Sequence, residues 1–346
     1  MILTNGYAAQ ASDAPLTPFQ FERRDPGPQD VVIEILYCGI CHSDIHSVRN
    51  EWAHGRYPMV PGHEIVGRVS RSGAGATKFK PGNLVGVGCF VDSCRVCPPC
   101  KEGTENYCEK GPLFTYNAED KAGQVTRGGY SSHIVVDESY VLRIPSGLDP
   151  ERAAPLLCAG ITTYSPLKQW KVGRGHRLAV VGLGGLGHMA VKFGVSLGAQ
   201  VTVISSSPSK RAEAHLLGAH DFVVTKDLTR RGELQSSFDF ILDTVSAPHD
   251  MDGLLTLLRR EGTLILVGAS PDPLPVSPFS LIFGRKNMAG SLIGGIRETQ
   301  EMLDFCAKAG LQADVEVIPL SQVNEAYDRV VRGDVRYRFV LDLKTL

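Results

Sequence analysis

Four cysteines stand close together in the first third of the chain. They are Cys94, Cys97, Cys100 and Cys108. Thiolates at such short intervals can close a tetrahedron around Zn²⁺ within one loop. Because four protein ligands leave no position for a substrate, the spacing predicts a structural zinc site, with a redox or disulfide cluster as the alternative.

A glycine-rich turn stands between a predicted strand at 177–181 and a predicted helix at 185–197. Its sequence is Gly182-Leu183-Gly184-Gly185-Leu186-Gly187. In the G-x-G-x-x-G pattern the first glycine allows a tight turn, the second lets the backbone approach a pyrophosphate, and the third brings helix and strand together. The following helix offers free N–H groups to an anion. The turn predicts dinucleotide binding; a purely structural turn is the alternative.

The next predicted strand, 201–204, ends without a carboxylate. It continues as Ser205-Ser206-Ser207-Pro208-Ser209-Lys210-Arg211. NAD sites usually place Asp or Glu here to bind the ribose 2′-hydroxyl. The hydroxyls of Ser205 and Ser206 and the cations of Lys210 and Arg211 can hold a 2′-phosphate instead, which predicts NADP(H). The alternative is a solvated loop in which Ser207 or Ser209 caps a helix.

A second, dispersed set of metal-binding side chains is Cys41, His63 and Cys158. Two thiolates and one imidazole leave a fourth zinc position open, as in the catalytic site of alcohol dehydrogenase. Spacing alone does not select them, because ten histidines and the remaining cysteines compete. The residues that follow them in the sequence favour this set, because a carboxylate stands close to two of the three: Asp44 follows Cys41, and Glu64 follows His63.

The composition is that of an ordinary globular protein of about two domains. The chain has 346 residues, of which 43% are hydrophobic, and a net charge of -1. This charge gives no reason to expect nucleic acid or an anionic membrane as a partner. No apolar run reaches the roughly 18 residues of a membrane helix, and no signal peptide is recognisable. Cysteines arranged for metal rather than disulfides favour the cytoplasm.

The pattern of elements changes near residue 155. Before it, short β-type runs such as 31–36 and 65–69 alternate with Pro-Gly turns, which predicts a β-rich domain. After it, strands alternate with helices, which predicts an α/β domain with a doubly wound parallel sheet. A last strand is expected at 337–343, where the tail can return to the first domain.

Together these motifs resemble the zinc-containing medium-chain alcohol dehydrogenases. The chain is most similar to the cinnamyl-alcohol-dehydrogenase-like group, which includes bacterial NADPH-dependent aldehyde reductases. Besides the cysteine loop and the glycine turn, the matching segments are GICHSDIH (39–46), VPGHE (60–64), GGYS (128–131), PLLCAGIT (155–162) and GSLIGG (290–295). The segment 117–125 departs from the plant members and is expected to border the substrate pocket, so the substrates of the plant enzymes do not carry over directly.

The resemblance implies a GroES-like catalytic domain of residues 1–154 and 291–346, with the structural zinc loop at 94–108. A Rossmann domain of residues 155–290 is inserted into it, and the active site is expected in the cleft between them. A homodimer is also implied.

The resemblance also assigns site residues. Cys41, His63 and Cys158 are the expected ligands of a catalytic zinc, so two zinc ions per chain are expected. Glu64 is an occasional ligand or lies just behind the ligands, and Asp44 orients His63. Two further residues relay a proton: Ser43 and His46. At the cofactor, Thr162 and Ile293 are expected at the nicotinamide and Arg338 at the pyrophosphate. Trp52 and Ile293 are expected to line the substrate pocket; the alternative is that both are core residues.

The implied activity is hydride transfer between NADP(H) and primary alcohol–aldehyde pairs, mainly the reduction of aromatic and medium-chain aldehydes. The first alternative is an NAD-linked polyol, amino-alcohol or secondary-alcohol dehydrogenase of the same superfamily. The second is a zinc-ribbon protein that binds nucleic acid through the cysteine loop.

Overall fold

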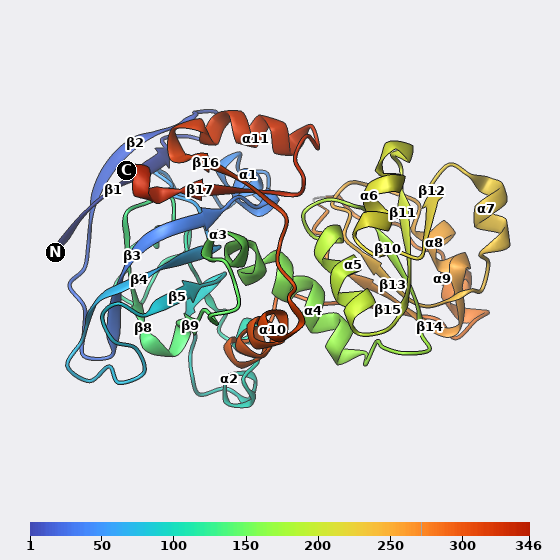
Figure 1. Ribbon diagram of the computed structural model, residues 1–346, viewed down its shortest axis with the longest axis horizontal. Helices are drawn as coiled ribbons and strands as arrows, with labels where there is room; N and C mark the ends of the chain where they lie inside the picture. Colours follow the sequence, from blue (N-terminus) through green and yellow to red (C-terminus); the bar gives the residue numbers. More distant parts are fainter. Residues whose placement is uncertain (271) are drawn as a thin grey trace. The chain divides into compact units, whose positions relative to one another are not determined.

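The computed structural model describes residues 1–270 and 272–346, and the chain divides into two compact units (Figure 1). The first unit comprises residues 1–161 and 293–346, and the second comprises residues 162–292. The chain therefore leaves the first unit, builds the second, and returns. The predicted domain boundaries, after residues 154 and 290, lie close to this division and stay predictions.

The first unit is organised around a seven-stranded sheet. Its main path runs β16-β17-β3-β4-β5-β9, and β8 also pairs with β3. The strands are β3 (Asp30–Gly39), β4 (Ile65–Ser72), β5 (Leu84–Val87), β8 (His133–Asp137), β9 (Leu142–Arg143), β16 (Val315–Pro319) and β17 (Arg338–Asp342). The tail strand β17 lies antiparallel to β3, so the last residues of the chain complete this sheet.

Two small two-stranded sheets and several helices accompany this sheet. The paired strands are β1 (Ile2–Ala9) with β2 (Leu16–Arg23), and β6 (Phe90–Asp92) with β7 (Leu113–Phe114). The helices are α1 (His42–Val48), α2 (Pro98–Glu102), α3 (Pro150–Ala153), α10 (Ile296–Ala309) and α11 (Val323–Val331). The 3₁₀ turns are η1 (Glu105–Tyr107), η2 (Glu138–Tyr140), η3 (Ala154–Leu157), η5 (Leu320–Gln322) and η6 (Leu343–Thr345).

The second unit contains a parallel sheet of six strands in the order β12-β11-β10-β13-β14-β15. The strands are β10 (Arg177–Val181), β11 (Gln200–Ser205), β12 (Asp221–Val224), β13 (Phe238–Asp243), β14 (Leu258–Leu266) and β15 (Asn287–Gly290). This is the strand order of doubly wound dinucleotide-binding sheets, in which ligands bind where the order reverses, here between β10 and β13. The predicted fold class is confirmed.

The helices of the second unit connect its parallel strands (Figure 1). They are α5 (Gly187–Ser196), α6 (Arg211–Leu216), α7 (Leu228–Glu233), α8 (Met251–Leu257) and α9 (Pro278–Ile282), while α4 (Ala159–Gln169) begins in the first unit. A sheet covered on both faces needs apolar strands, and residues 178–181 of β10 are all buried. Across residues 1–270 and 272–346, no helix has the length and apolar character that crossing a membrane requires.

Candidate zinc centres and nucleotide-binding turn

Four potential metal ligands from distant parts of the sequence meet in the first unit. Each of Cys41, His63, Glu64 and Cys158 offers one ligand atom, and these atoms all lie within 4.8 Å of one another. Cys41 precedes α1, His63 and Glu64 precede β4, and Cys158 follows η3. All four residues are buried. The structure thus brings together the dispersed ligands expected from the sequence, with Glu64 among them.

The geometry of this cluster fits zinc. The Sγ atoms of Cys41 and Cys158 are 3.8 Å apart. Zinc–sulfur bonds of about 2.3 Å in a tetrahedron place two sulfur atoms roughly 3.8 Å apart. Two thiolates, one imidazole and a nearby carboxylate are also ligands that zinc prefers.

Asp44 fixes the orientation of His63. Its fully buried carboxylate accepts hydrogen bonds from His63 Nδ1 at 3.0 Å, from the Gly62 amide at 3.1 Å and from the Cys41 amide at 2.9 Å. Because Nδ1 carries the donated proton, the lone pair of His63 is on Nε2 and is free for a metal. The expected orienting role of Asp44 therefore has a direct geometric basis.

The cluster is organised to carry negative charge. A hydrogen bond from the Cys158 thiol lowers the pKa of Cys41 well below its usual value, and the same bond raises the pKa of Cys158. Burial opposes a charge on His63, but the Asp44 carboxylate raises its pKa above the ordinary value. A bound cation would relieve the competition between the two thiols for one negative charge.

Glu64 is paired with Arg338 inside the first unit. The Arg338 guanidinium donates to a Glu64 carboxylate oxygen, and both side chains are almost fully buried. Burial raises the pKa of Glu64 to about 7, against the opposing effect of the Arg338 charge. Arg338 Nε is buried and lacks a partner among the described residues. The expected role of Arg338 at the pyrophosphate stays a prediction.

Ser43 and His46, the expected proton relay, lie three residues apart on α1 and so share one face of the helix. His46 Nδ1 pairs with the Glu51 carboxylate, while His46 Nε2 is buried without a partner in the described part of the chain. The Trp52 ring lies 5.1 Å from the His46 ring, between centroids. Glu51 was not anticipated: it lies beyond the end of α1, where no helical spacing links it to His46.

Three tyrosines near the cluster were given no role by the sequence analysis, although Tyr130 lies in its GGYS segment. The Tyr116 ring stacks on His63 at 5.9 Å, and its hydroxyl donates to the Ser43 carbonyl. Tyr130 donates to Asp44 at 3.3 Å, and Tyr327 donates to Tyr130 at 3.4 Å. No local spacing marks these residues, because their partners lie far away in the sequence.

The four cysteines of the loop also form a compact cluster. Their ligand atoms lie within 4.8 Å of one another, with Sγ–Sγ distances of 3.4 Å between Cys97 and Cys100 and 3.9 Å between Cys94 and Cys100. The amides of Val96 and Cys97 lower the pKa of Cys94 to about 6, whereas burial raises that of Cys100 to about 12. Four thiolates therefore need a cation to coexist, and the donor set fits a fully protein-bound zinc.

The glycine turn leads from β10 into α5, as expected. Gly182 has φ +89°, which side chains rarely adopt. A Cβ on Gly187 would collide with the Gly182 carbonyl, whereas a Cβ on Gly184 would stand in open space. The open space beside Gly184 would let a pyrophosphate approach the backbone closely. The N-terminus of α5 lies at the same turn and offers its free N–H groups to an anion.

The serine-rich end of β11 lies beside this turn. Lys210 Nζ donates to the Leu183 carbonyl at 2.8 Å, which brings its charge to the turn. Ser205 Oγ accepts from the Ser207 amide, and Ser206 is exposed. Arg211 instead donates to the Phe222 carbonyl at 3.0 Å. Ser207 precedes the 3₁₀ turn η4 (Pro208–Lys210) but makes no side-chain cap, so the capping alternative has no hydrogen bond to support it.

The two residues expected at the nicotinamide fall in different units. Thr162 is buried in α4 and begins the second unit, while Ile293 is buried at the start of the returning segment of the first. Their roles stay predictions.

Comparisons with known proteins identify the class. The Alcohol dehydrogenase GroES-like domain matches residues 27–146, and the Zinc-binding dehydrogenase family matches residues 185–308. The chain belongs to the zinc-binding alcohol dehydrogenases.

Three individual relatives indicate which group within this family the chain is similar to. The chain is 53% identical to "NADP-dependent alcohol dehydrogenase C" of Mycobacterium tuberculosis, over 98% of each chain. It is 54% identical to "Aldehyde reductase YahK" of Escherichia coli, over 98% of this chain and 97% of the relative. The crystal structure of CAD from Helicobacter pylori complexed with NADP(H) superimposes with a TM-score of 0.94, at 44% identity over 99% of both chains. The predicted family and enzyme class are confirmed, and a zinc-ribbon protein that binds nucleic acid finds no support.

Proposed function

We propose that this protein uses NADP(H) and zinc to interconvert primary alcohols and aldehydes, mainly by reducing aromatic and medium-chain aldehydes. The observation that carries the proposal is the buried cluster of Cys41, His63 and Cys158, in which Asp44 holds His63 Nδ1. The names of the relatives in Mycobacterium tuberculosis and Escherichia coli support the same chemistry.

Cys41, His63 and Cys158 would hold the catalytic zinc, with Glu64 close by as an occasional ligand. Zinc bound there supplies Lewis-acid polarisation of the substrate oxygen. Ser43 donates the proton that the reduced substrate oxygen needs, and His46 returns a proton to Ser43 from solvent. The pairing of His46 Nδ1 with Glu51 supports this route, because it leaves Nε2 as the basic nitrogen.

The nucleotide is NADP(H) because the end of β11 offers hydroxyls and a cation but no carboxylate. A 2′-phosphate carries close to two negative charges and favours the ammonium of Lys210 and the hydroxyls of Ser205 and Ser206. NADPH supplies the hydride. Thr162 and Ile293 are proposed to contact the nicotinamide, and Trp52 with Ile293 to line the substrate pocket.

An activity panel tests the proposal. The purified protein should contain two zinc ions and oxidise NADPH faster with benzaldehyde or hexanal than with acetophenone. Cys41→Ser should abolish activity, whereas Cys306→Ala, outside both cysteine clusters, should leave it nearly unchanged. Polyols or secondary alcohols turning over faster than primary alcohols, or equal use of NADH, would favour the NAD-linked alternative.

We further propose a cytoplasmic homodimer. Nine cysteines, none in a disulfide within the described residues, support a reducing compartment. Helix α9 and the residue after it expose Phe279 and Ile282, each 63% accessible, and Phe283, 85% accessible. The neighbouring sheet ends at β15, which has no further partner strand among the described residues. An exposed apolar patch beside a sheet edge supports association with a second copy.

A further inference from the structure

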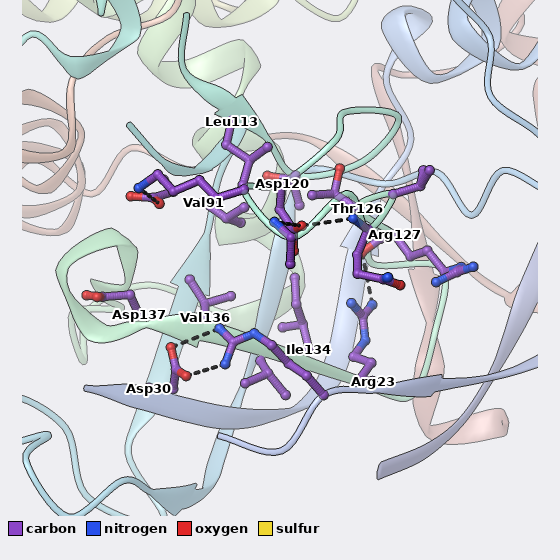
Figure 2. Close-up of a pocket in the computed structure, with 18 of the residues that line it drawn as sticks. Arg23, Asp30, Val91, Leu113, Asp120, Thr126, Arg127, Ile134, Val136 and Asp137 are labelled. Atoms are coloured by element: carbon purple, nitrogen blue, oxygen red, sulfur yellow. Dashed lines mark hydrogen bonds and ion pairs between the residues drawn. The ribbon is translucent and has the colours of Figure 1, made fainter. Parts of the chain in front are cut away.

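A cavity in the first unit is lined by none of the clustered cysteines, although Arg95 of the zinc loop stands in its wall. It has a volume of about 540 Å³, within the range of small-molecule sites. Figure 2 shows it between the sheet residues Ile134 and Val136 on one side and the loop around Asp120 and Thr126 on the other. None of the candidate zinc ligands lines it. The segment 117–125, which was expected at the substrate pocket, supplies part of the wall of this separate cavity.

Most charged groups in this cavity neutralise one another. Arg24 pairs with Asp30, and Arg95 pairs with both Asp92 and Asp137. The dashed lines to Asp30 in Figure 2 mark the first of these pairs. Asp92 also accepts from the exposed Lys121 at 3.1 Å. At this end of the cavity the positive and negative side chains are therefore already paired with one another.

Arg23 and Arg127 form the opposite end, and neither makes an ion pair with a carboxylate of the described residues. Each guanidinium lies 5.1 Å from the centroid of the Phe21 ring. Arg23 donates only to neutral oxygens: the carbonyls of Arg127 and Gly128 and the hydroxyl of Ser131. Both Nε atoms are buried and have no partner among the described residues. Burial and the charge of Arg127 lower the pKa of Arg23 to about 9.

Two neighbouring, partly buried cations without an ion-pair partner are costly unless an anion joins them. Guanidinium groups bind carboxylates through paired N–H donors, and Phe21 holds both groups at one place. Glu22 and Asp120 also line the cavity, and Asp120 accepts hydrogen bonds from the amides of Ala122 and Gln124. Apolar side chains line part of the remaining wall, namely Val91, Leu113, Val125, Ile134 and Val136. We propose that this cavity binds a small organic carboxylate, with its charge at Arg23 and Arg127 and its apolar body against these side chains.

Calorimetric titration with benzoate tests this site. The enzyme is loaded with zinc and saturated with NADP⁺, so that the nucleotide site does not compete. Benzoate should bind saturably, and Arg127→Gln should weaken binding about tenfold or more, since charge-assisted hydrogen bonds are lost. Lys121→Gln is the matched control: it removes a positive charge from the same cavity but should leave the affinity unchanged. Benzoate binding that is absent, or equally strong in Arg127→Gln, overturns the proposal.

Thermal unfolding separates binding from a role in folding. Arg23→Gln can fail to fold, because Arg23 ties three backbone and side-chain oxygens, so Arg127→Gln is the decisive variant. Without benzoate it should be at least as stable as the parent, since it removes a like charge beside Arg23. Benzoate should raise the unfolding temperature of the parent and of Lys121→Gln, but not of Arg127→Gln. An equal rise in Arg127→Gln contradicts the site. These results do not depend on alcohol or aldehyde turnover.

Discussion

At the scale of single residues, Asp44 organises the candidate catalytic centre. Its one carboxylate accepts from the segment that carries Cys41, from the segment that carries His63, and from Tyr130. Three stretches of chain are thus held together by a buried group that never needs to touch a substrate. Such supporting hydrogen bonds set the orientation and basicity of a histidine ligand.

Replacing Asp44 should therefore weaken the catalytic zinc selectively. Asp44→Asn is expected to lower zinc affinity at the Cys41 cluster by about 10–100-fold, as loss of such partners typically does. Zinc content after dialysis against a chelator should fall from two ions towards one. Tyr130→Phe, which keeps the Asp44 carboxylate, should have a smaller effect. Unchanged zinc retention in Asp44→Asn would show that the hydrogen bond to His63 contributes little.

Cofactor choice is also decided by single residues. Ser205→Asp places a carboxylate where a 2′-phosphate is proposed, so kcat/KM for NADPH should fall by about tenfold or more while that for NADH changes less. Lys210→Ala should raise KM for NADPH and leave that for NADH nearly unchanged. Ser207→Ala is the control, because the Ser207 hydroxyl bonds to Ser209. Parallel losses with both cofactors would mean that Ser205 and Lys210 act only through the fold.

At the scale of elements, the cysteine loop has little regular structure of its own. It contains only the five-residue α2 and the three-residue η1. Cys97→Ser should remove one zinc and lower stability, because metal binding contributes folding free energy. The unfolding midpoint, measured by calorimetry, should drop by roughly 1–2 °C per kcal/mol lost. Cys41→Ser should instead lose activity with a small change in midpoint; equal midpoints for both variants would contradict a structural role for the loop.

The end of β13 should make stability depend on pH. His249 Nε2 meets Asp243 at 2.9 Å and Nδ1 meets the Ala247 carbonyl at 2.8 Å. The hydrogen bond to Asp243 raises the pKa of His249 above 6.5. The stabilisation is therefore complete below pH 6.5 and is lost as the pH rises through the raised pKa. It is expected to be less than about 1 kcal/mol, because the His249 side chain is partly exposed, although Asp243 is buried.

Chemical denaturation of the parent and His249→Gln between pH 5.5 and 9 measures this contribution. The variant should be less stable at low pH, and the difference should shrink above pH 6.5. A difference that grows with pH would contradict the assignment.

The elements differ in how far the sequence predicts them. The glycine turn is local, and so its strand, its helix and the roles of three glycines follow from one hexapeptide. The helical segment after the serine-rich run is less regular: the 3₁₀ turn η4 starts at Pro208, α6 follows it, and Gly218, whose φ is +99°, stands just beyond the end of α6. The bond from Tyr327 to Tyr130 spans 197 residues and the pair of Arg338 with Glu64 spans 274. No periodicity encodes such contacts.

At the scale of the whole molecule, the chain passes through one unit twice. The returning segment supplies β17, which pairs with β3, and Arg338, which pairs with Glu64. The first unit and its metal centre therefore need both ends of the sequence. The second unit is continuous and ends its sheet at β15, and the proposed association of two chains belongs to this edge.

Association through α9 gives a direct test. The parent should elute with twice the mass of one chain in size-exclusion chromatography with light scattering, and Phe283→Asp should elute as a monomer. Phe283 is 85% accessible, so the substitution should cost the fold little while it places a charge in the proposed interface. Leu216→Asp is the matched control, because Leu216 is 88% accessible on α6 and lies outside the patch. A monomeric parent would contradict the proposed dimer. A dimer that survives Phe283→Asp would show that the exposed side chains of α9 take no part in assembly.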